Sequence, residues 1–159
     1  MRSIHDIAAD YCSWVERSAE HPNLAQWLPR ILAELIHAAF SLPDDGLADA
    51  VAEDFQRRDY QQIRAELPSL PFQYYGEVLE PLDLEAADET GFGDLYDDLA
   101  DIYGDLSEGL FIHRHGSPTE AERYWSQSFR FHWGKHATGA LRALYCARRH
   151  QPETPSRAL

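Results

Sequence analysis

Apolar residues recur at helical spacing along the first part of the chain. In residues 4–19 they fall three or four positions apart, and a second such segment follows Asn23, which can cap it. Pro29 falls in the first turns of the second segment, where a missing N–H costs little. These residues therefore predict two amphipathic helices, with stripes of Ile4, Ile7, Ala8, Tyr11 and Val15 in the first and Leu28, Ile31, Leu32, Leu35, Ala38 and Ala39 in the second.

A weaker helical pattern follows a turn-rich stretch at residues 41–46. Its apolar positions are Leu47, Val51, Phe55, Ile63 and Leu67. The charged run Arg57-Arg58-Asp59 interrupts this stripe, so we expect the third helix to be broken there.

Residues 68–93 carry prolines, glycines and aromatics in place of a helical period. We expect a long irregular connection, pinned to the rest of the protein over residues 72–81 and mobile over residues 83–91, and nothing in the chain has the pattern of a sheet. Two clear helices are predicted at residues 94–114 and 119–149. The turn Gly116-Ser117-Pro118 makes them antiparallel, with Ser117 or Thr119 as the cap.

The whole pattern predicts an all-α fold in one domain. We expect an up-and-down bundle of four to five helices over residues 1–150, crossed by the long irregular segment. Residues 151–159, with two prolines and no apolar period, are expected to form a frayed tail.

Composition and charge narrow the function classes. The chain has 159 residues, a formal charge of −13 and two Cys, without a long apolar run or a signal-peptide pattern. We therefore expect a cytoplasmic protein that binds neither nucleic acid nor an anionic membrane. The whole net charge lies in residues 65–113, which hold 13 acids and no Lys or Arg, while residues 114–159 hold an excess of bases.

The acids of the predicted helix at 94–114 gather on the side opposite its apolar stripe. They form an acidic ridge of Asp94, Asp97, Asp98, Asp101, Asp105 and Glu108. Like charges four positions apart oppose helix formation by roughly 0.2–0.5 kcal/mol per pair, so something should compensate for them. Solvation and the helix N-terminus explain Asp94 and Asp97. For Asp98, Asp101 and Asp105 a bound cation or a basic partner surface is the functional alternative.

His132 and His136 lie four positions apart on the apolar face of the last predicted helix. This spacing brings two imidazoles within reach of one metal ion, with Asp98 or Asp101 to complete the site. The intervening Trp133-Gly134-Lys135 lacks the glutamate of the zinc-hydrolase motif. The structural alternative, which the sequence favours, is that each buried ring donates a hydrogen bond to Asp98 or Asp101.

Glycines and cysteines near these histidines have simpler explanations. Gly134 and Gly139 each cost about 1 kcal/mol in a helix, and we interpret them as permitting close approach of another helix. Cys12 and Cys146 lie at the borders of apolar faces and are expected to be inert buried thiols.

Four blocks of the sequence resemble a bacterial domain-of-unknown-function family, number 5063. They are Ala9-Asp10-Tyr11-Cys12, Tyr74-Tyr75 with Val78 and Pro81, the block at residues 97–106, and His132-Trp133-Gly134-Lys135-His136 with residues 140–144. The resemblance implies a small, mostly helical bacterial protein and supplies no activity or catalytic residues. Gly104 departs from it, because we expect a longer polar or basic side chain there, a partner that the acidic ridge then lacks.

Two hypotheses follow. The first is a non-enzymatic interaction module that engages a basic protein surface through the acidic ridge and needs no cofactor. The second is a protein that binds a divalent metal ion, with hydrolysis as the activity such a site would allow. His132 and His136 would be the ligands, and Asp98 or Asp101 would complete the site. The sequence does not indicate an oligomeric state.

Overall fold

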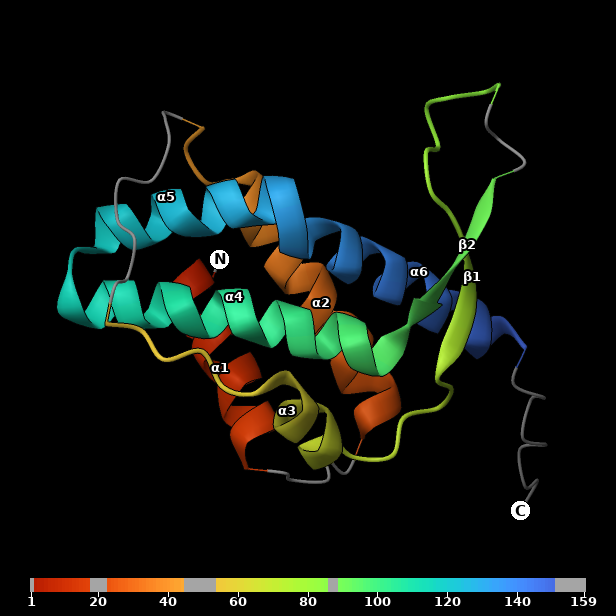
Figure 1. The fold of residues 1–159 in the computed structure, drawn as a ribbon, viewed down its shortest axis with the longest axis horizontal. Coiled ribbons are helices and arrows are strands. Elements are labelled where there is room, and N and C mark those ends of the chain that lie inside the picture. Colours follow the sequence, from red (N-terminus) through yellow and green to blue (C-terminus); the bar gives the residue numbers. More distant parts are fainter. Residues whose placement is uncertain (1, 18–22, 45–53, 86–88, 151–159) are drawn as a thin grey trace, which may run out of the picture.

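The computed structural model describes residues 2–17, 23–44, 54–85 and 89–150. Over these ranges the chain forms a mostly helical single domain with a small two-stranded sheet, so the predicted helical fold is confirmed (Figure 1). No helix in these ranges is long and apolar enough to cross a membrane. The predicted tail at residues 151–159, and Leu47 and Val51 of the predicted third helix, lie outside the described residues.

Helices α1 (Ile4–Glu16) and α2 (Leu24–Phe40) bury the apolar stripes that their spacing predicts. Ser3 begins α1 by accepting a hydrogen bond from the backbone N–H of Asp6. Every residue of both predicted stripes is buried. Helix α1 packs against α2 and against the later helix α4, while α2 packs against α6.

Helix α3 (Tyr60–Glu66) is shorter than the pattern predicts. Asp59, in the predicted break, is its N-cap and accepts a hydrogen bond from the Gln62 N–H at 3.0 Å. Ile63 is buried as predicted, whereas Phe55 lies outside the helix and packs on Phe111. The break leaves Arg57 and Arg58 on a segment without regular secondary structure.

The prediction that nothing forms a sheet is wrong. Strand β1 (Tyr74–Val78) pairs antiparallel with β2 (Thr90–Asp94), within the segment expected to be irregular. Three of the ten strand residues are glycines, so the apolar alternation typical of a strand is missing from the sequence. Tyr75 lies opposite Gly93, where a Cβ would overlap the tyrosine ring, and this glycine lets the ring cross the neighbouring strand.

A helical hairpin completes the fold. Helix α4 (Leu95–His115) is followed by a rod made of α5 (Pro118–Ser128), a π-helical turn η1 (Phe129–Trp133) and α6 (Gly134–Arg149), which runs antiparallel to α4 (Figure 1). Ser117 caps α5 in a capping box with Glu120, as one of the two predicted alternatives. The single helix predicted at residues 119–149 is therefore interrupted by a π-helical turn.

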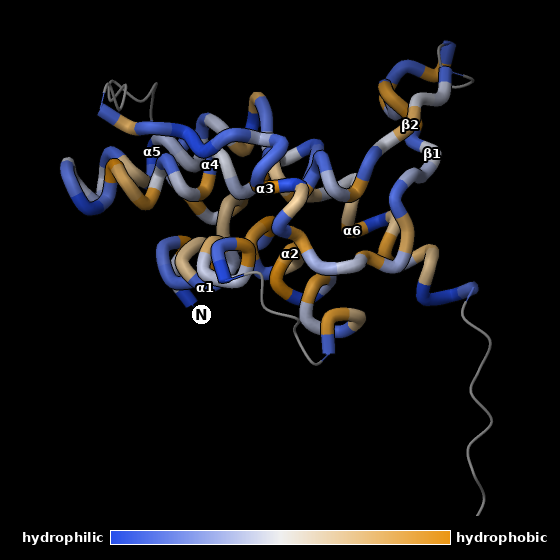
Figure 2. The backbone as a smooth tube through the Cα atoms, turned by 60° about the horizontal axis from the view of Figure 1, so that its bottom comes forward, coloured by the Kyte–Doolittle hydropathy of each residue, from blue (hydrophilic) through white to orange (hydrophobic). Residues whose placement is uncertain are grey.

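Helix α4 lies at the centre of the fold, in contact with α1, α3, α5 and α6. On its predicted apolar side Leu95, Leu99, Ile102 and Leu106 are fully buried, and Leu110 is partly buried. Gly109 lets the Trp125 indole lie against the α4 backbone, where its N–H reaches the Leu106 carbonyl at 3.4 Å. Figure 2 shows the alternation of hydrophobic and hydrophilic stretches along α2 and α5. With one side of α4 in the core, its acidic side faces α3, the hairpin and the α5–α6 rod.

Candidate functional site

The N-terminal acids of α4 pair with α3. Asp94 caps α4 and also accepts hydrogen bonds from Arg64 at 2.9 Å and from Gln73 at 3.0 Å, and Arg64 pairs with Asp97 as well. Although burial acts in the opposite direction, the hydrogen bonds from Gln73 and Arg64 hold the pKa of Asp94 below its usual value. The two acids at the start of the acidic ridge therefore share one cation within the fold.

The C-terminal acids of the ridge pair with Arg57. Its guanidinium contacts Asp105 at 2.7 Å and Glu108 at 3.0 Å. A Cβ on Gly104 would lie 2.9 Å from Arg57 Nη1, so the absence of a side chain at Gly104 makes room for this arginine. The expectation that Gly104 deprives the ridge of a partner is therefore wrong, because Arg57 supplies the cation from another segment.

Both candidate histidines face α4 and hydrogen-bond to its carboxylates. His132 Nδ1 lies 2.6 Å from Asp105 Oδ2, and His136 Nδ1 lies 2.9 Å from Asp98 Oδ1. Asp98 and Asp105 are the two buried charged residues of the described chain, with 5% and 3% exposure. An ionised carboxylate only accepts hydrogen bonds, so Nδ1 of each ring carries the proton.

Tyr75 supports this arrangement from the β-hairpin. Its hydroxyl donates to Asp98 Oδ2 at 2.6 Å, so the two oxygens of Asp98 are held by Tyr75 and His136. Burial, followed by this hydrogen bond, raises the pKa of Tyr75 far above its usual value, which keeps the hydroxyl a donor at neutral pH. Sequence reasoning missed Tyr75, Arg57 and Arg64 as partners. The like charges of the acidic ridge indicated that such partners were needed, but the sequence did not indicate which residues supply them.

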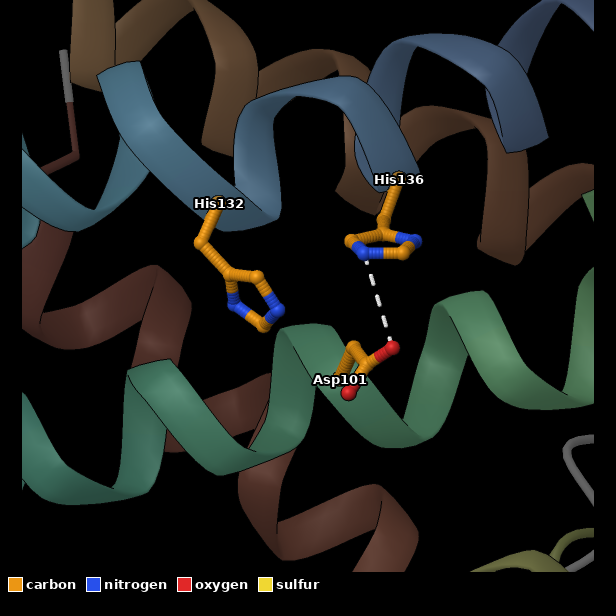
Figure 3. A group of neighbouring side chains, drawn as sticks. All are labelled: Asp101, His132 and His136. Carbon is orange, nitrogen blue, oxygen red and sulfur yellow. Dashed lines mark ion pairs between the residues drawn. The ribbon is translucent and has the colours of Figure 1, made fainter.

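Asp101 and the two histidines form a cluster of metal-ligating groups (Figure 3). One ligand atom from each lies within 4.8 Å of the others, and His136 Nε2 is 3.5 Å from Asp101 Oδ2. The side chains of His132, Asp101 and His136 are 40%, 29% and 17% exposed, so solvent reaches the cluster. His132 is thus half-exposed, whereas the helical projection places it on the buried face.

The π-helical turn sets the position of His132. The Gly134 N–H bonds the Phe129 carbonyl five residues back, and a Cβ on Gly134 would overlap that carbonyl oxygen. Gly134 is therefore needed by its own π turn, and Gly139 by the β-hairpin, since a Cβ there would lie 2.7 Å from the Tyr75 hydroxyl. The prediction that these glycines admit another helix is corrected in both cases.

The predicted site residues thus fall into two groups. Asp101, His132 and His136 come together, while Asp98 orients His136 through Nδ1 and lies outside this ligand cluster. Of the acids predicted to bind a partner, Asp98 and Asp105 are buried, which is not the exposure that a partner-binding surface requires.

The two cysteines lie in different surroundings. Cys12 is buried as expected, and burial raises the pKa of its thiol well above the usual value. Cys146 is exposed on α6, contrary to the expectation of a buried thiol. Its place near the end of the helix puts it beyond the core that α6 covers.

Comparisons with known proteins support the fold and supply no activity. Residues 1–150 match the family model described as Domain of unknown function (DUF5063). The crystal structure of protein BF1032 from Bacteroides fragilis is similar, with a TM-score of 0.65 and 21% identity over 91% of this chain and 92% of that chain. At this identity the likeness shows the fold alone. A search of curated proteins finds no match.

Proposed function

The chain belongs to the DUF5063 family, and we propose that it binds a divalent transition-metal ion through His132, His136 and Asp101. The observation that supports this most directly is the use of Nδ1 in both rings. Because buried carboxylates occupy Nδ1, the remaining nitrogen, Nε2, is the one available to a ligand. Carboxylates that hold metal-binding histidines in this way are the usual outer shell of such sites.

The donor set fits a zinc-like ion. Two imidazoles and one carboxylate suit Zn²⁺ or Fe²⁺, and three protein ligands leave a coordination position for water, as in catalytic zinc sites. Bonds of about 2.0–2.1 Å in a tetrahedral site separate the ligand atoms by about 3.3 Å. His136 and Asp101 are already near this spacing, and a ligand nitrogen of His132 lies within 4.8 Å of them, so the His132 ring would move closer when the ion binds.

Local charge also supports a cation here. The acids at both ends of the ridge pair with Arg57 or Arg64, whereas Asp98 and Asp101 have no Arg or Lys partner among the residues that the structure describes. His136 contacts both of them. A divalent ion between His136 Nε2 and Asp101 would offset the charge of these carboxylates.

A calorimetric titration of Zn²⁺ into untagged, chelator-stripped protein tests the proposal. We expect one equivalent to bind and the melting temperature to rise with Zn²⁺ concentration. His132→Gln keeps a donor for Asp105 but loses the imidazole, and Asp101→Asn loses the carboxylate. Each should weaken Zn²⁺ binding by more than the roughly 10–100-fold that loss of an outer-shell partner costs.

His150→Gln is the matched control, because His150 is an exposed histidine at the end of α6, away from the cluster. It should bind Zn²⁺ as the unmodified protein does. Equal Zn²⁺ affinity in the unmodified protein and the folded His132→Gln variant would show that the ion binds elsewhere and would reject the proposal.

The second candidate function is binding of a basic protein partner. The exposed acidic and apolar residues of the β-hairpin arm favour it. This arm, residues 74–85 and 89–94, has no Lys or Arg, and Glu80, Asp83, Glu85 and Glu89 are all exposed on it. Leu82 is 95% and Phe92 88% exposed beside them. An apolar surface among acids fits a basic partner better than the internally paired ridge of α4 does.

Changing Glu80 and Glu85 to Gln tests this candidate, with Glu122→Gln on α5 as the control. A partner captured from bacterial extract should be lost from the arm variant and released by salt, but retained by the control. Equal capture of the partner by both variants would show that the acids of the arm do not bind it.

A further inference from the structure

A groove of about 650 Å³ lies between the β-hairpin and α6. Figure 1 shows the hairpin beside the C-terminal part of this helix. The volume falls within the roughly 300–1,000 Å³ typical of small-molecule sites. It is a separate feature from the histidine cluster, since His132, His136 and Asp101 do not line it.

The walls of the groove are apolar on both sides. The hairpin contributes Tyr74, Val78 and Leu79, and α6 contributes Ala143 and Ala147. The hairpin lies directly on the helix at Gly139, where a Cβ would meet the Tyr75 hydroxyl and the Glu77 carboxylate, and this contact falls between Lys135 and Arg142 along α6. An apolar ligand body therefore finds cover on two faces.

Two cations lie along the helix side of the groove. Lys135 and Arg142 both line it and are exposed, and neither has an ion-pair partner among the residues that the structure describes. They are seven positions apart, which puts them on the same side of α6 about 10 Å apart along its axis. Glu77 is the one acid that lines the groove, so its charge is positive, in contrast to the strongly acidic chain.

We propose that the groove binds a small organic anion with an apolar body, its carboxylate or phosphate group held by Lys135 and Arg142. Arg142 suits bidentate recognition of either head group, and Lys135 acts as a second point charge. The apolar walls bury the body of the ligand, and removal of water strengthens the contact between the anion and the cations. This inference is independent of metal binding.

The test uses a pair of fluorescent probes that differ in charge. Anilinonaphthalene sulfonate is an aromatic anion, and phenylnaphthylamine is its neutral analogue. We expect Lys135→Gln with Arg142→Gln to weaken binding of the anionic probe at least about tenfold, the equivalent of about 1.4 kcal/mol, and to leave binding of the neutral probe unchanged. Arg148→Gln, an exposed arginine of α6 outside the groove, is the matched control and should change neither.

Cys146 provides a second readout, because it lines the groove and is exposed while Cys12 is buried. Saturation with the anionic probe should slow maleimide labelling of Cys146 at least about tenfold in the unmodified protein. Displacement of the probe by decanoate would assign a carboxylate head group, and displacement by decyl phosphate a phosphate group. Displacement by neither, unchanged labelling of Cys146, or equal probe affinity in the double variant would overturn the proposal.

Discussion

At the scale of single residues, Asp98 and Asp105 decide which atoms of the two imidazoles are available. Each buried carboxylate holds Nδ1 of one ring and is itself held by a second donor, Tyr75 for Asp98 and Arg57 for Asp105. Fixed carboxylates orient the rings and increase the basicity of the opposite nitrogen. The two aspartates therefore act as positioning residues for His132 and His136.

Asp98→Asn tests this positioning role. The amide still accepts a hydrogen bond from His136 but lacks the charge, so we expect Zn²⁺ affinity to fall about 10–100-fold. Calorimetry measures the change, and a urea titration checks that the variant remains folded. Glu108→Gln, which alters an acid of α4 that pairs with Arg57, is the control and should bind Zn²⁺ normally. Unchanged affinity in Asp98→Asn would contradict the role.

Sequence reasoning reached part of this site. The four-residue spacing of His132 and His136 placed both on one side of a helix, and Asp98 and Asp101 were the predicted acceptors, which is where His136 lies. The contact of His132 with Asp105 was missed, because a π turn shifts the side-chain register that an ideal helix predicts.

At the scale of secondary structure, the π turn η1 links helix geometry to the site. It inserts one residue into the hydrogen-bond pattern, buries Trp133 and leaves His132 half-exposed above α4. Such turns are common at functional sites, and this one depends on the missing side chain of Gly134.

Gly134→Ala distinguishes this π turn from an ordinary helix. In an ordinary helix the change would stabilise the protein by up to about 1 kcal/mol. Here the new Cβ overlaps the Phe129 carbonyl, so we expect the free energy of unfolding to fall by about 1–3 kcal/mol, as measured by urea denaturation. Zn²⁺ affinity should fall with it, because His132 moves. A stabilised variant with normal affinity would contradict this account of the turn.

The N-terminus of α4 predicts a pH dependence. Asp94 has a pKa below its ordinary value of 3.8 in the folded protein, so its charge contributes stability above that pH, and the contribution is lost as the pH falls through the folded pKa. Asp94→Asn retains a capping side chain but loses the charge. Its unfolding free energy should lie below that of the unmodified protein at pH 7 and converge with it at acid pH. A constant difference at every pH would contradict this.

The β-hairpin is the element that sequence reasoning could not find. Tyr75 pairs with Gly93 and Val78 with Thr90. Residues 79–89 separate the two strands in the sequence, so no short turn motif identifies the hairpin. Gly76, Gly91 and Gly93 remove the alternation that identifies a strand. Helices were predictable because their stripes are local, whereas this hairpin depends on contacts with α4 and α6.

At the scale of the whole molecule, the net charge of −13 is concentrated in residues 65–113 and is partly balanced inside the fold. Arg57, Arg64 and His132 meet acids of α4, so much of the ridge is not a free acidic surface. The other charged features are an acidic hairpin arm, a positively charged groove between this arm and α6, and the cluster around His136. The metal site is the central property that we propose for this molecule.

Anomalous X-ray scattering at the zinc edge, from crystals of the untagged protein grown with one equivalent of Zn²⁺, tests that claim most directly. We expect one strong peak about 2.0–2.2 Å from a nitrogen of His132, a nitrogen of His136 and an oxygen of Asp101. A strong peak at another place, such as the stacked His5 and His113 rings, with none at this cluster, would contradict it.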